Sequence, residues 1–283
     1  MRLLDYDWKV KNVSEWRKLW FLGDQHLGSA ACAVGHLKET IQEIKNDPES
    51  RVILMGDCCD FINISDPRFD IDFLAKEFHG HLGDLVKSQC NAFIKLHEPI
   101  AAQTLCLLPG NHEKKIDRKY HNNPAEAIAV ALNIPLKSEI TQARLRVSDK
   151  TRSFILKGVL SHAYKSASLL GSKVSATGRI LDFFGDHDFI AQAHMHEYGA
   201  LPVTTLDVIG EFGEPRIHHR ERWILMTGGY LKTYEEGPGG YGETRAYRPT
   251  KLGTPCLKFR FQRTNRVTDG KKHSLDKPEM KAE

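Results

Sequence analysis

The sequence has no CxxC pair, no long apolar run and no strong excess of either charge. Without closely spaced pairs, its six cysteines predict buried, reduced thiols rather than a disulfide framework or a zinc-thiolate site. A bilayer span takes roughly 20 consecutive apolar residues, so no membrane-spanning helix is expected. Acidic residues near Met1 interrupt the apolar stretch that a signal peptide needs, which predicts a cytoplasmic protein.

The net charge of +4 permits a polyanionic partner but does not demand one. The chain has no internal repeat and no low-complexity linker, and 283 residues can form one large domain with its own core. We place this domain at residues 1–263 and interpret the polar residues 264–283 as a charged, disordered tail. The sequence is compatible with a homo-oligomer but does not specify one.

Short apolar runs alternate with helical patterns in the first half, which is typical of an α/β sheet with crossover connections. The runs at 18–22, 51–55 and 104–108 predict buried strands, and those at 31–45, 72–102 and 124–132 predict helices. The second half predicts a hairpin over 144–156, a helix over 175–184, and strands over 188–193, 203–208, 216–226 and 256–263. We therefore expect two stacked sheets with helices outside them.

Five polar clusters follow apolar runs, at the strand ends where open α/β sheets bind their ligands. Carboxylate, amide and imidazole groups suit divalent metal ions, and the clusters hold enough of them for two ions. The clusters are Asp24-Gln25-His26, Gly56-Asp57-Cys58-Cys59-Asp60, Gly110-Asn111-His112-Glu113, Ser161-His162 and His194-Met195-His196.

The second cluster offers a carboxylate that two ions could share. A strand-end aspartate is more often a helix cap, but a binuclear site needs one carboxylate between its ions, and Asp57 is the candidate. Asp60 is expected to orient a ligand rather than bind metal. We interpret Cys58 and Cys59 as packing residues.

The third cluster is the most specific. The neutral Asn111 carbonyl suits a site that already carries carboxylate charge. His112 is then held beside the metals without binding them, as a proton donor to the leaving oxygen or to the developing phosphate charge. Glu113 is expected to fix the ring of a neighbouring histidine. By itself His162 is more often an ordinary core histidine than a ligand, and only its position after a strand makes it a candidate.

The ordered set D-x-H, G-D-x-x-D, G-N-H-[DE], H and H-x-H, spanning residues 19–196, resembles the calcineurin-like metallophosphoesterase superfamily. The resemblance implies a metallo-dependent phosphatase fold, a four-layer α/β/β/α sandwich of two mixed sheets. It also implies that Asp57 is shared by both metals and that His112 acts on the phosphate and the leaving group. One metal would be held by Asp24, His26, Asp57 and His196, and the other by Asp57, Asn111, His162 and His194.

Departures from that pattern indicate which branches of the superfamily the sequence resembles. Ser161 and Ala193 stand where family members often have glycine, which keeps every ligand. Gly-Asn-His-Glu also resembles the Ser/Thr protein phosphatases, but Asp60 is followed by Phe61-Ile62 instead of Arg-Gly, which argues against that activity. The opening Gly-Asp-x-His-Leu-Gly resembles both the DNA-repair nuclease and the UDP-diacylglucosamine pyrophosphatase branches. Residues 230–253 resemble metallophosphoesterases of phages and prokaryotes.

We expect hydrolysis of phosphodiester bonds in DNA, RNA or a nucleotide by metal-activated water. The ligand set suits manganese first, with iron, zinc or nickel as alternatives. A nucleotide-sugar-lipid pyrophosphatase and a phosphomonoesterase remain open, and a non-catalytic scaffold would be expected to have lost ligands. Residues expected to contact the substrate are Lys114, Lys115, Arg118, Lys165, Arg245 and Tyr247.

Overall fold

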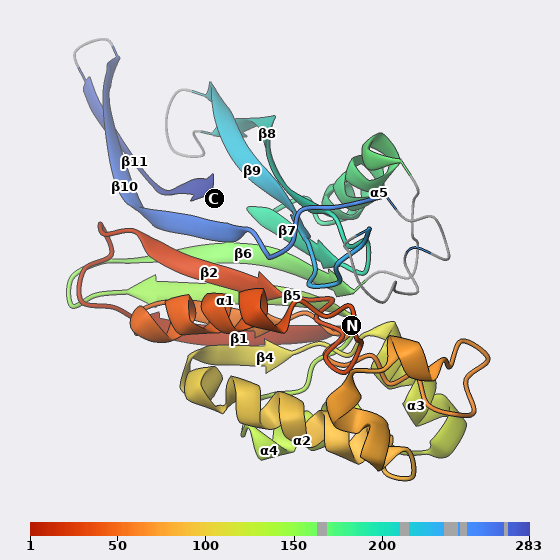
Figure 1. Cartoon of the computed structure of the whole chain (residues 1–283). Coiled ribbons are helices and arrows are strands. Elements are labelled where there is room, and N and C mark those ends of the chain that lie inside the picture. Colours follow the sequence, from red (N-terminus) through yellow and green to blue (C-terminus); the bar gives the residue numbers. More distant parts are fainter. Residues whose placement is uncertain (163–168, 210–214, 235–242, 244–247, 269–270) are drawn as a thin grey trace.

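Two mixed sheets stack face to face in the computed structural model, which describes residues 1–162, 169–209, 215–234, 243, 248–268 and 271–283 (Figure 1). The six-stranded sheet has the order β1 (Arg2–Lys9), β5 (Ile140–Ser148), β6 (Ser153–His162), β7 (Phe189–Ala193), β9 (Arg216–Thr227) and β8 (Tyr198–Ile209). The five-stranded sheet has the order β11 (Lys271–Ala282), β10 (Cys256–Thr268), β2 (Arg17–Leu22), β3 (Arg51–Leu54) and β4 (Thr104–Leu107). Each sheet combines parallel and antiparallel pairs.

The main core lies between the sheets. Phe21 and Ile53 of the five-stranded sheet pack in one cluster with Leu145, Leu160 and Phe189 of the six-stranded sheet. The rings of Phe21 and Phe189 meet across the interface at 5.6 Å between centroids. Strands buried on both faces explain the continuous apolar runs of the sequence.

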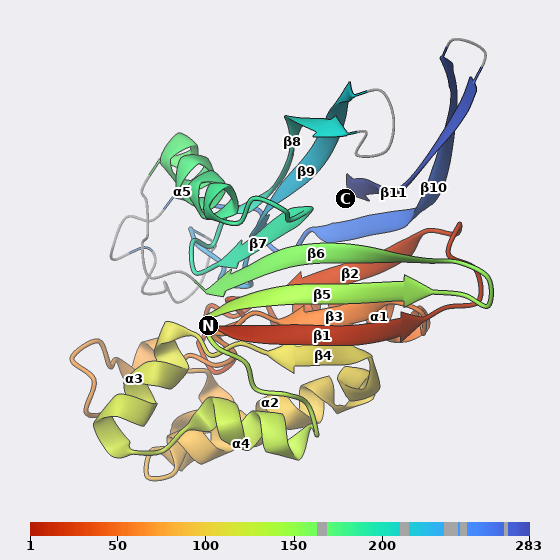
Figure 2. The ribbon, with the colours of Figure 1, turned by 180° about the vertical axis from the view of Figure 1, so that it is seen from behind.

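Helices cover the outer faces of both sheets. On the five-stranded sheet, α1 (Val34–Asn46), α2 (Leu85–His97) and α4 (Pro124–Ala131) bury Leu37, Phe93 and Ile128 in one cluster with strand residue Leu54. On the other sheet, α5 (Leu170–Phe183) packs Leu181 against strand residues. Figure 2 shows α2 and α4 on one side of the stacked sheets and α5 on the other. The predicted four-layer α/β/β/α sandwich is therefore confirmed.

Three segments differ from the sequence prediction. The helix expected over 72–102 is broken into the 3₁₀ turns Ile71–Phe73, Lys76–His81 and Glu98–Gln103 around α2, because glycines precede α2 and Pro99 follows it. Strand β1 was not predicted, although Leu4 and Trp8 alternate with exposed residues along it. Helix α3 (Asn111–Tyr120) was also missed, since it is mostly charged.

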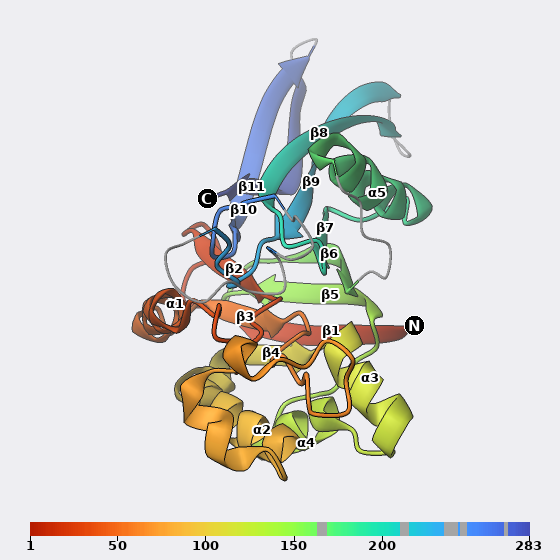
Figure 3. The ribbon, with the colours of Figure 1, turned by 45° about the vertical axis from the view of Figure 1, so that its right-hand side comes forward.

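The expected tail is also different. Residues beyond 263 continue β10 and form β11, and the two strands pair antiparallel along their length. Figure 3 shows this hairpin extending past the other strands, as the β8–β9 hairpin does. Met280 of β11 is buried in the core between the sheets, and Glu283 exchanges main-chain hydrogen bonds of 2.9 and 3.0 Å with Cys256. Apolar residues are sparse in this segment, so the sequence did not indicate a strand.

All six cysteines are free and buried, as predicted. Cys58 and Cys59 lie in the cluster under the outer helices, which agrees with a packing role. Within the described ranges, the search for helices long and apolar enough to cross a membrane finds none.

Candidate metal centre

The carboxyl ends of the parallel strands β2, β3 and β4, and of β6 and β7, lead into the five polar clusters. Five candidate ligands have left-handed backbone conformations, with φ of 50° at Asp24, 47° at His26, 48° at Asp57, 76° at His194 and 49° at His196. Such angles cost about 1–3 kcal/mol each in non-glycine residues and occur where surrounding contacts fix them. The chain thus turns sharply where each strand ends and directs these side chains into one region.

Close backbone packing holds the first three clusters together. The main-chain amides of Asp24 and His26 donate to the carbonyls of Gly56 and Asp57 at 3.1 Å each. A Cβ on Gly110 would lie 2.2 Å from both the amide nitrogen and Oδ1 of Asp57, so no other residue fits there.

The first donor group consists of Asp24, His26 and His196, whose ligand atoms lie within 4.8 Å of one another. The Nε2 atoms of His26 and His196 face each other at 3.3 Å, and His196 Nε2 is 3.7 Å from Asp24 Oδ1. Asp24 Oδ2 accepts the His194 amide at 2.8 Å, whereas buried Oδ1 has no hydrogen-bond partner among the described residues. Two facing imidazole nitrogens and an unpartnered carboxylate oxygen fit a cation.

The second donor group consists of Asp57, His162 and His194, again within 4.8 Å. His162 Nε2 is 3.3 Å from Asp57 Oδ2 and 3.1 Å from Asn111 Oδ1. The other ring nitrogen, Nδ1, donates to the Met55 carbonyl at 2.7 Å, which orients the ring. Because Nε2 faces two oxygen acceptors, a second proton or a metal ion must supply positive charge between them. Sequence reasoning missed Met55, since a main-chain carbonyl leaves no residue-type signal.

Asp57 connects the two donor groups. Its Oδ2 lies 3.3 Å from His162 Nε2 and 3.8 Å from His26 Nε2. Its Oδ1 accepts the His112 amide at 2.9 Å, which fixes the carboxylate plane. One carboxylate oxygen is therefore within reach of histidines from both groups.

The electrostatics reflect this crowding of charged groups. Burial raises the pKa of Asp24 to about 7. Burial also disfavours the Asp57 carboxylate, but the adjacent His162 and His112 outweigh it and hold the Asp57 pKa well below its usual value. Burial likewise opposes protonation of His162, yet the Asp57 charge raises the His162 pKa to about 10. The site thus favours a cation beside Asp57.

Asp60, which was expected to orient a ligand, contacts the rings of two histidines. Its Oδ1 is 3.4 Å from His26 Nδ1 and 3.9 Å from His112 Nδ1, and His112 Nδ1 also donates to the Asp60 carbonyl. The rings of His26 and His112 meet edge to face, 4.7 Å between centroids. His26, Asp60 and His112 form a third group that could hold an ion.

Glu113 differs from its prediction. It was expected to orient a histidine ring, but its carboxylate accepts three main-chain amides, from Gly110 at 2.8 Å, Asp57 at 3.1 Å and Cys58 at 2.7 Å. Glu113 therefore fixes the backbone of two loops that carry candidate ligands against each other, and its hydrogen bonds position main-chain groups.

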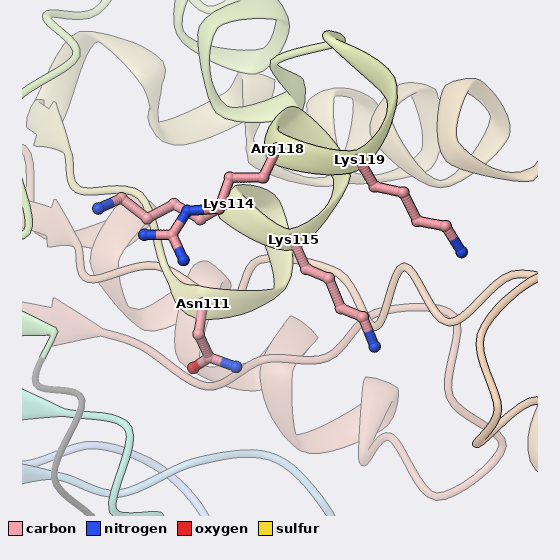
Figure 4. Close-up of a pocket in the computed structure, with 5 residues that line it drawn as sticks. All are labelled: Asn111, Lys114, Lys115, Arg118 and Lys119. Atoms are coloured by element: carbon pink, nitrogen blue, oxygen red, sulfur yellow. The ribbon is translucent and has the colours of Figure 1, made fainter.

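A basic pocket lies beside the second group (Figure 4). Its volume is about 350 Å³, and its lining residues all belong to α3. Three other residues expected to contact the substrate, Lys165, Arg245 and Tyr247, lie outside the described residues. The pocket is lined by Asn111, Lys114, Lys115, Arg118 and Lys119.

Comparison with family models finds no match, and comparison with curated proteins finds none either. Among solved structures, the chain is similar to a conserved uncharacterized protein, described as a predicted phosphoesterase, from Streptococcus pneumoniae TIGR4. The identity is 11%, the match covers 93% of this chain and 99% of that chain, and the TM-score is 0.34. At so low a TM-score, the function must be argued from the site itself.

Proposed function

We propose that the chain is a binuclear metal-dependent phosphoesterase, a hydrolase that cleaves phosphodiester bonds in a nucleic acid or nucleotide. The position of Asp57 carries the proposal, because its Oδ2 lies 3.8 Å and 3.3 Å from one histidine of each donor group. A shared carboxylate is the feature that separates a two-metal site from two unrelated polar clusters.

The proposed ligands form two sets that share Asp57. Two divalent ions bound by these sets would neutralise phosphate charge and activate water. The oxygen and imidazole donors suit manganese, with iron, zinc or nickel as alternatives. One set is Asp24, His26, Asp57 and His196, and the other is Asp57, Asn111, His162 and His194.

His112 is the proposed acid. Its Nδ1–H donates to the Asp60 carbonyl, so the doubly protonated ring is the form that can give its Nε2 proton to the departing oxygen. Its main-chain amide donates to Asp57 Oδ1, so the His112 backbone and the shared carboxylate are held in a fixed position relative to each other. The His112 side chain is 10% exposed, so a small part of its surface is accessible.

A second candidate function, hydrolysis of a nucleotide-sugar-lipid pyrophosphate, has one observation in its favour. Leu169, Leu170 and Phe183 at the two ends of α5 are 72%, 41% and 80% exposed. Exposed apolar side chains at these two ends could contact acyl chains. The basic pocket beside Asn111 favours the nucleic-acid substrate instead.

The test combines metal analysis with a substrate panel. Purified protein loaded with manganese is expected to bind two ions per chain and to hydrolyse bis-p-nitrophenyl phosphate faster than p-nitrophenyl phosphate. Single- and double-stranded DNA, RNA, cyclic dinucleotides and a lipid-linked nucleotide pyrophosphate complete the panel.

Inactivity on every ester with manganese, iron, zinc and nickel would overturn the proposal. Preference for the monoester would show that the chain is a phosphomonoesterase and not a diesterase. Cleavage of the lipid substrate alone would favour the second candidate function, pyrophosphate hydrolysis. The free, buried cysteines suit a reducing compartment, and cytoplasmic localisation remains our expectation.

A further inference from the structure

The basic pocket and the candidate metal centre share a residue. Asn111 lines the pocket, and its Oδ1 lies 3.1 Å from His162 Nε2. A substrate held at the metal centre therefore has the pocket immediately beside its reacting phosphate. What the pocket binds bears directly on what the enzyme cleaves.

The cations of the pocket are not equivalent. Lys115 pairs with Asp66 at 2.6 Å, and Lys114 pairs with Glu139. Lys119 donates to the carbonyl of Ser65 at 2.9 Å. Arg118 is exposed and makes no ion pair with any of the described residues.

Helix geometry aligns Arg118 with Asn111. Seven residues separate them, so they lie two turns apart on one face with a rise of about 10 Å. Side chains of a helix lean toward its N-terminus, so Arg118 reaches back toward the metal centre. Figure 4 shows Arg118 and Lys114 extending to the same side of α3, while Lys115 and Lys119 extend to the other.

We propose that Arg118 binds the phosphate that adjoins the scissile phosphodiester, so that the substrate is a strand with at least two neighbouring phosphates. This inference rests on the proposed function and specifies its substrate. A guanidinium presents a planar fork of donors that matches phosphate oxygens. Because Arg118 makes no ion pair with the described residues, it breaks none of those contacts when it binds a phosphate. A basic helix face that merely raised the local potential would not depend on a particular second phosphate.

The test compares substrates that differ by one phosphate. Thymidylyl dinucleotide TpT carries one phosphodiester and the trinucleotide TpTpT carries two, and the matching ribo-oligonucleotides distinguish DNA from RNA. The measured quantity is the ratio of kcat/KM for trinucleotide over dinucleotide, in manganese-loaded wild type, Arg118→Gln, Arg118→Lys and Arg146→Gln. Arg146 is exposed on β5, opposite Ile155, and lies far along the strand from Ser161.

The wild type is expected to prefer the trinucleotide, and Arg118→Gln should reduce that preference about tenfold. Arg118→Lys should restore part of it, because the charge returns without the fork. Arg146→Gln, which removes the same charge elsewhere, should keep the wild-type ratio. Arg118→Gln should also reduce the slope of log KM against log salt by about 1.

A wild-type ratio near one, or an equal loss in Arg118→Gln and Arg146→Gln, would overturn the inference. Either result leaves the proposed function standing as long as bis-p-nitrophenyl phosphate is cleaved. Loss of all ester hydrolysis in the wild type would instead refute the proposed function itself.

Discussion

Asp57 shows how much one side chain can determine at the residue scale. It is 1% exposed, its backbone has a φ of 48°, and its two oxygens contact three of the polar clusters. Nearby imidazoles hold its pKa well below its usual value against the effect of burial, so it remains charged at neutral pH.

Asp57→Asn should therefore disrupt metal binding with little change in shape. The amide is neutral and nearly isosteric, and we expect metal affinity to fall at least about 100-fold. Loss of a residue that only hydrogen-bonds to a metal ligand can already reduce affinity by that factor. Metal content after dialysis measures this, with Asp7→Asn on β1 as the exposed control. Two tightly bound ions in Asp57→Asn would contradict a shared carboxylate.

His112 should act on the leaving group and not on metal binding. Asparagine can keep the hydrogen bond to the Asp60 carbonyl but lacks the Nε2 proton, so His112→Asn should lower kcat about 10²–10⁴-fold with two ions still bound. The loss should be larger for an oligonucleotide, which leaves as an alkoxide, than for a p-nitrophenyl ester. An equal loss on both substrates would argue against proton donation.

From the sequence, these residues could be proposed as one site, but the contacts that hold them could not be predicted. Motif spacing brought Asp24, Asp57 and His162 to one expected site, because strand ends of parallel sheets converge. It could not reveal that five candidate ligands have positive φ, since backbone strain depends on tertiary contacts. Nor could it reveal the Met55 carbonyl that orients His162.

At the element scale, α3 begins on a buried anchor. Glu113 accepts amides from Gly110, Asp57 and Cys58, so the helix start is tied to the loop after β3. Burial and the Asp57 charge raise the Glu113 pKa, so the ionised form carries an electrostatic cost. The sequence prediction gave Glu113 a histidine ring as its partner, whereas its carboxylate accepts main-chain amides.

Glu113→Gln should destabilise both the fold and the site. A glutamine amide must turn its NH₂ toward at least one of the three donors, leaving a buried amide unpaired at about 1–3 kcal/mol. Urea unfolding and metal titration measure the two effects. Glu126→Gln, on the exposed side of α4, is the matched control. Unchanged stability together with lost metal binding would point to direct ligation instead.

Helix α2 contains a titrating group far from the proposed chemistry. His97 is fully buried, stacks on Phe93 at 3.8 Å between ring centroids, and donates Nδ1–H to the Phe93 carbonyl at 3.0 Å. Burial lowers its pKa to about 4 from 6.5. Above pH 6.5 the His97 imidazole is neutral in both the folded and the unfolded chain. Its effect on stability therefore appears only at lower pH.

His97 should therefore make the fold acid-sensitive. Between pH 6.5 and 4 the unfolded chain binds the proton first, so about 3 kcal/mol of stability should be lost as the pH falls through this window. The free energy of unfolding of wild type minus that of His97→Asn, measured from pH 7 to 4, isolates this effect from the site histidines. His81→Asn, exposed beside Asp84, should give no such difference. A flat difference curve would show that His97 is protonated equally in both states.

At the scale of the whole molecule, the sequence predicted the layers and the edge strands β4 and β8, but not the edge strands β1 and β11. Central strands read as continuous apolar runs because both of their faces are covered. Strand β1 buries only Leu4 and Trp8, and the polar, charged composition of β11 resembles that of a tail. Sequence and structure therefore disagree on the effect of truncating the C-terminal segment. A disordered tail could be removed without loss of stability, whereas a paired strand could not.

Removal of residues 264–283 should destabilise the whole sandwich. It deletes β11, takes Met280 out of the core between the sheets, and exposes the edge of β10 next to Phe259 and Phe261. Burial of one such methionine contributes about 1.5–3 kcal/mol, and the unpaired edge should also promote aggregation. In the full chain, Met280→Ala should cost about 2–5 kcal/mol, whereas volume-conserving Met280→Leu should cost less than about 1.5 kcal/mol. Urea unfolding with light scattering measures all three variants. If the truncated chain unfolds at the same urea concentration as the wild type, residues 264–283 behave as the tail that their composition suggests, and the hairpin contributes nothing to the fold.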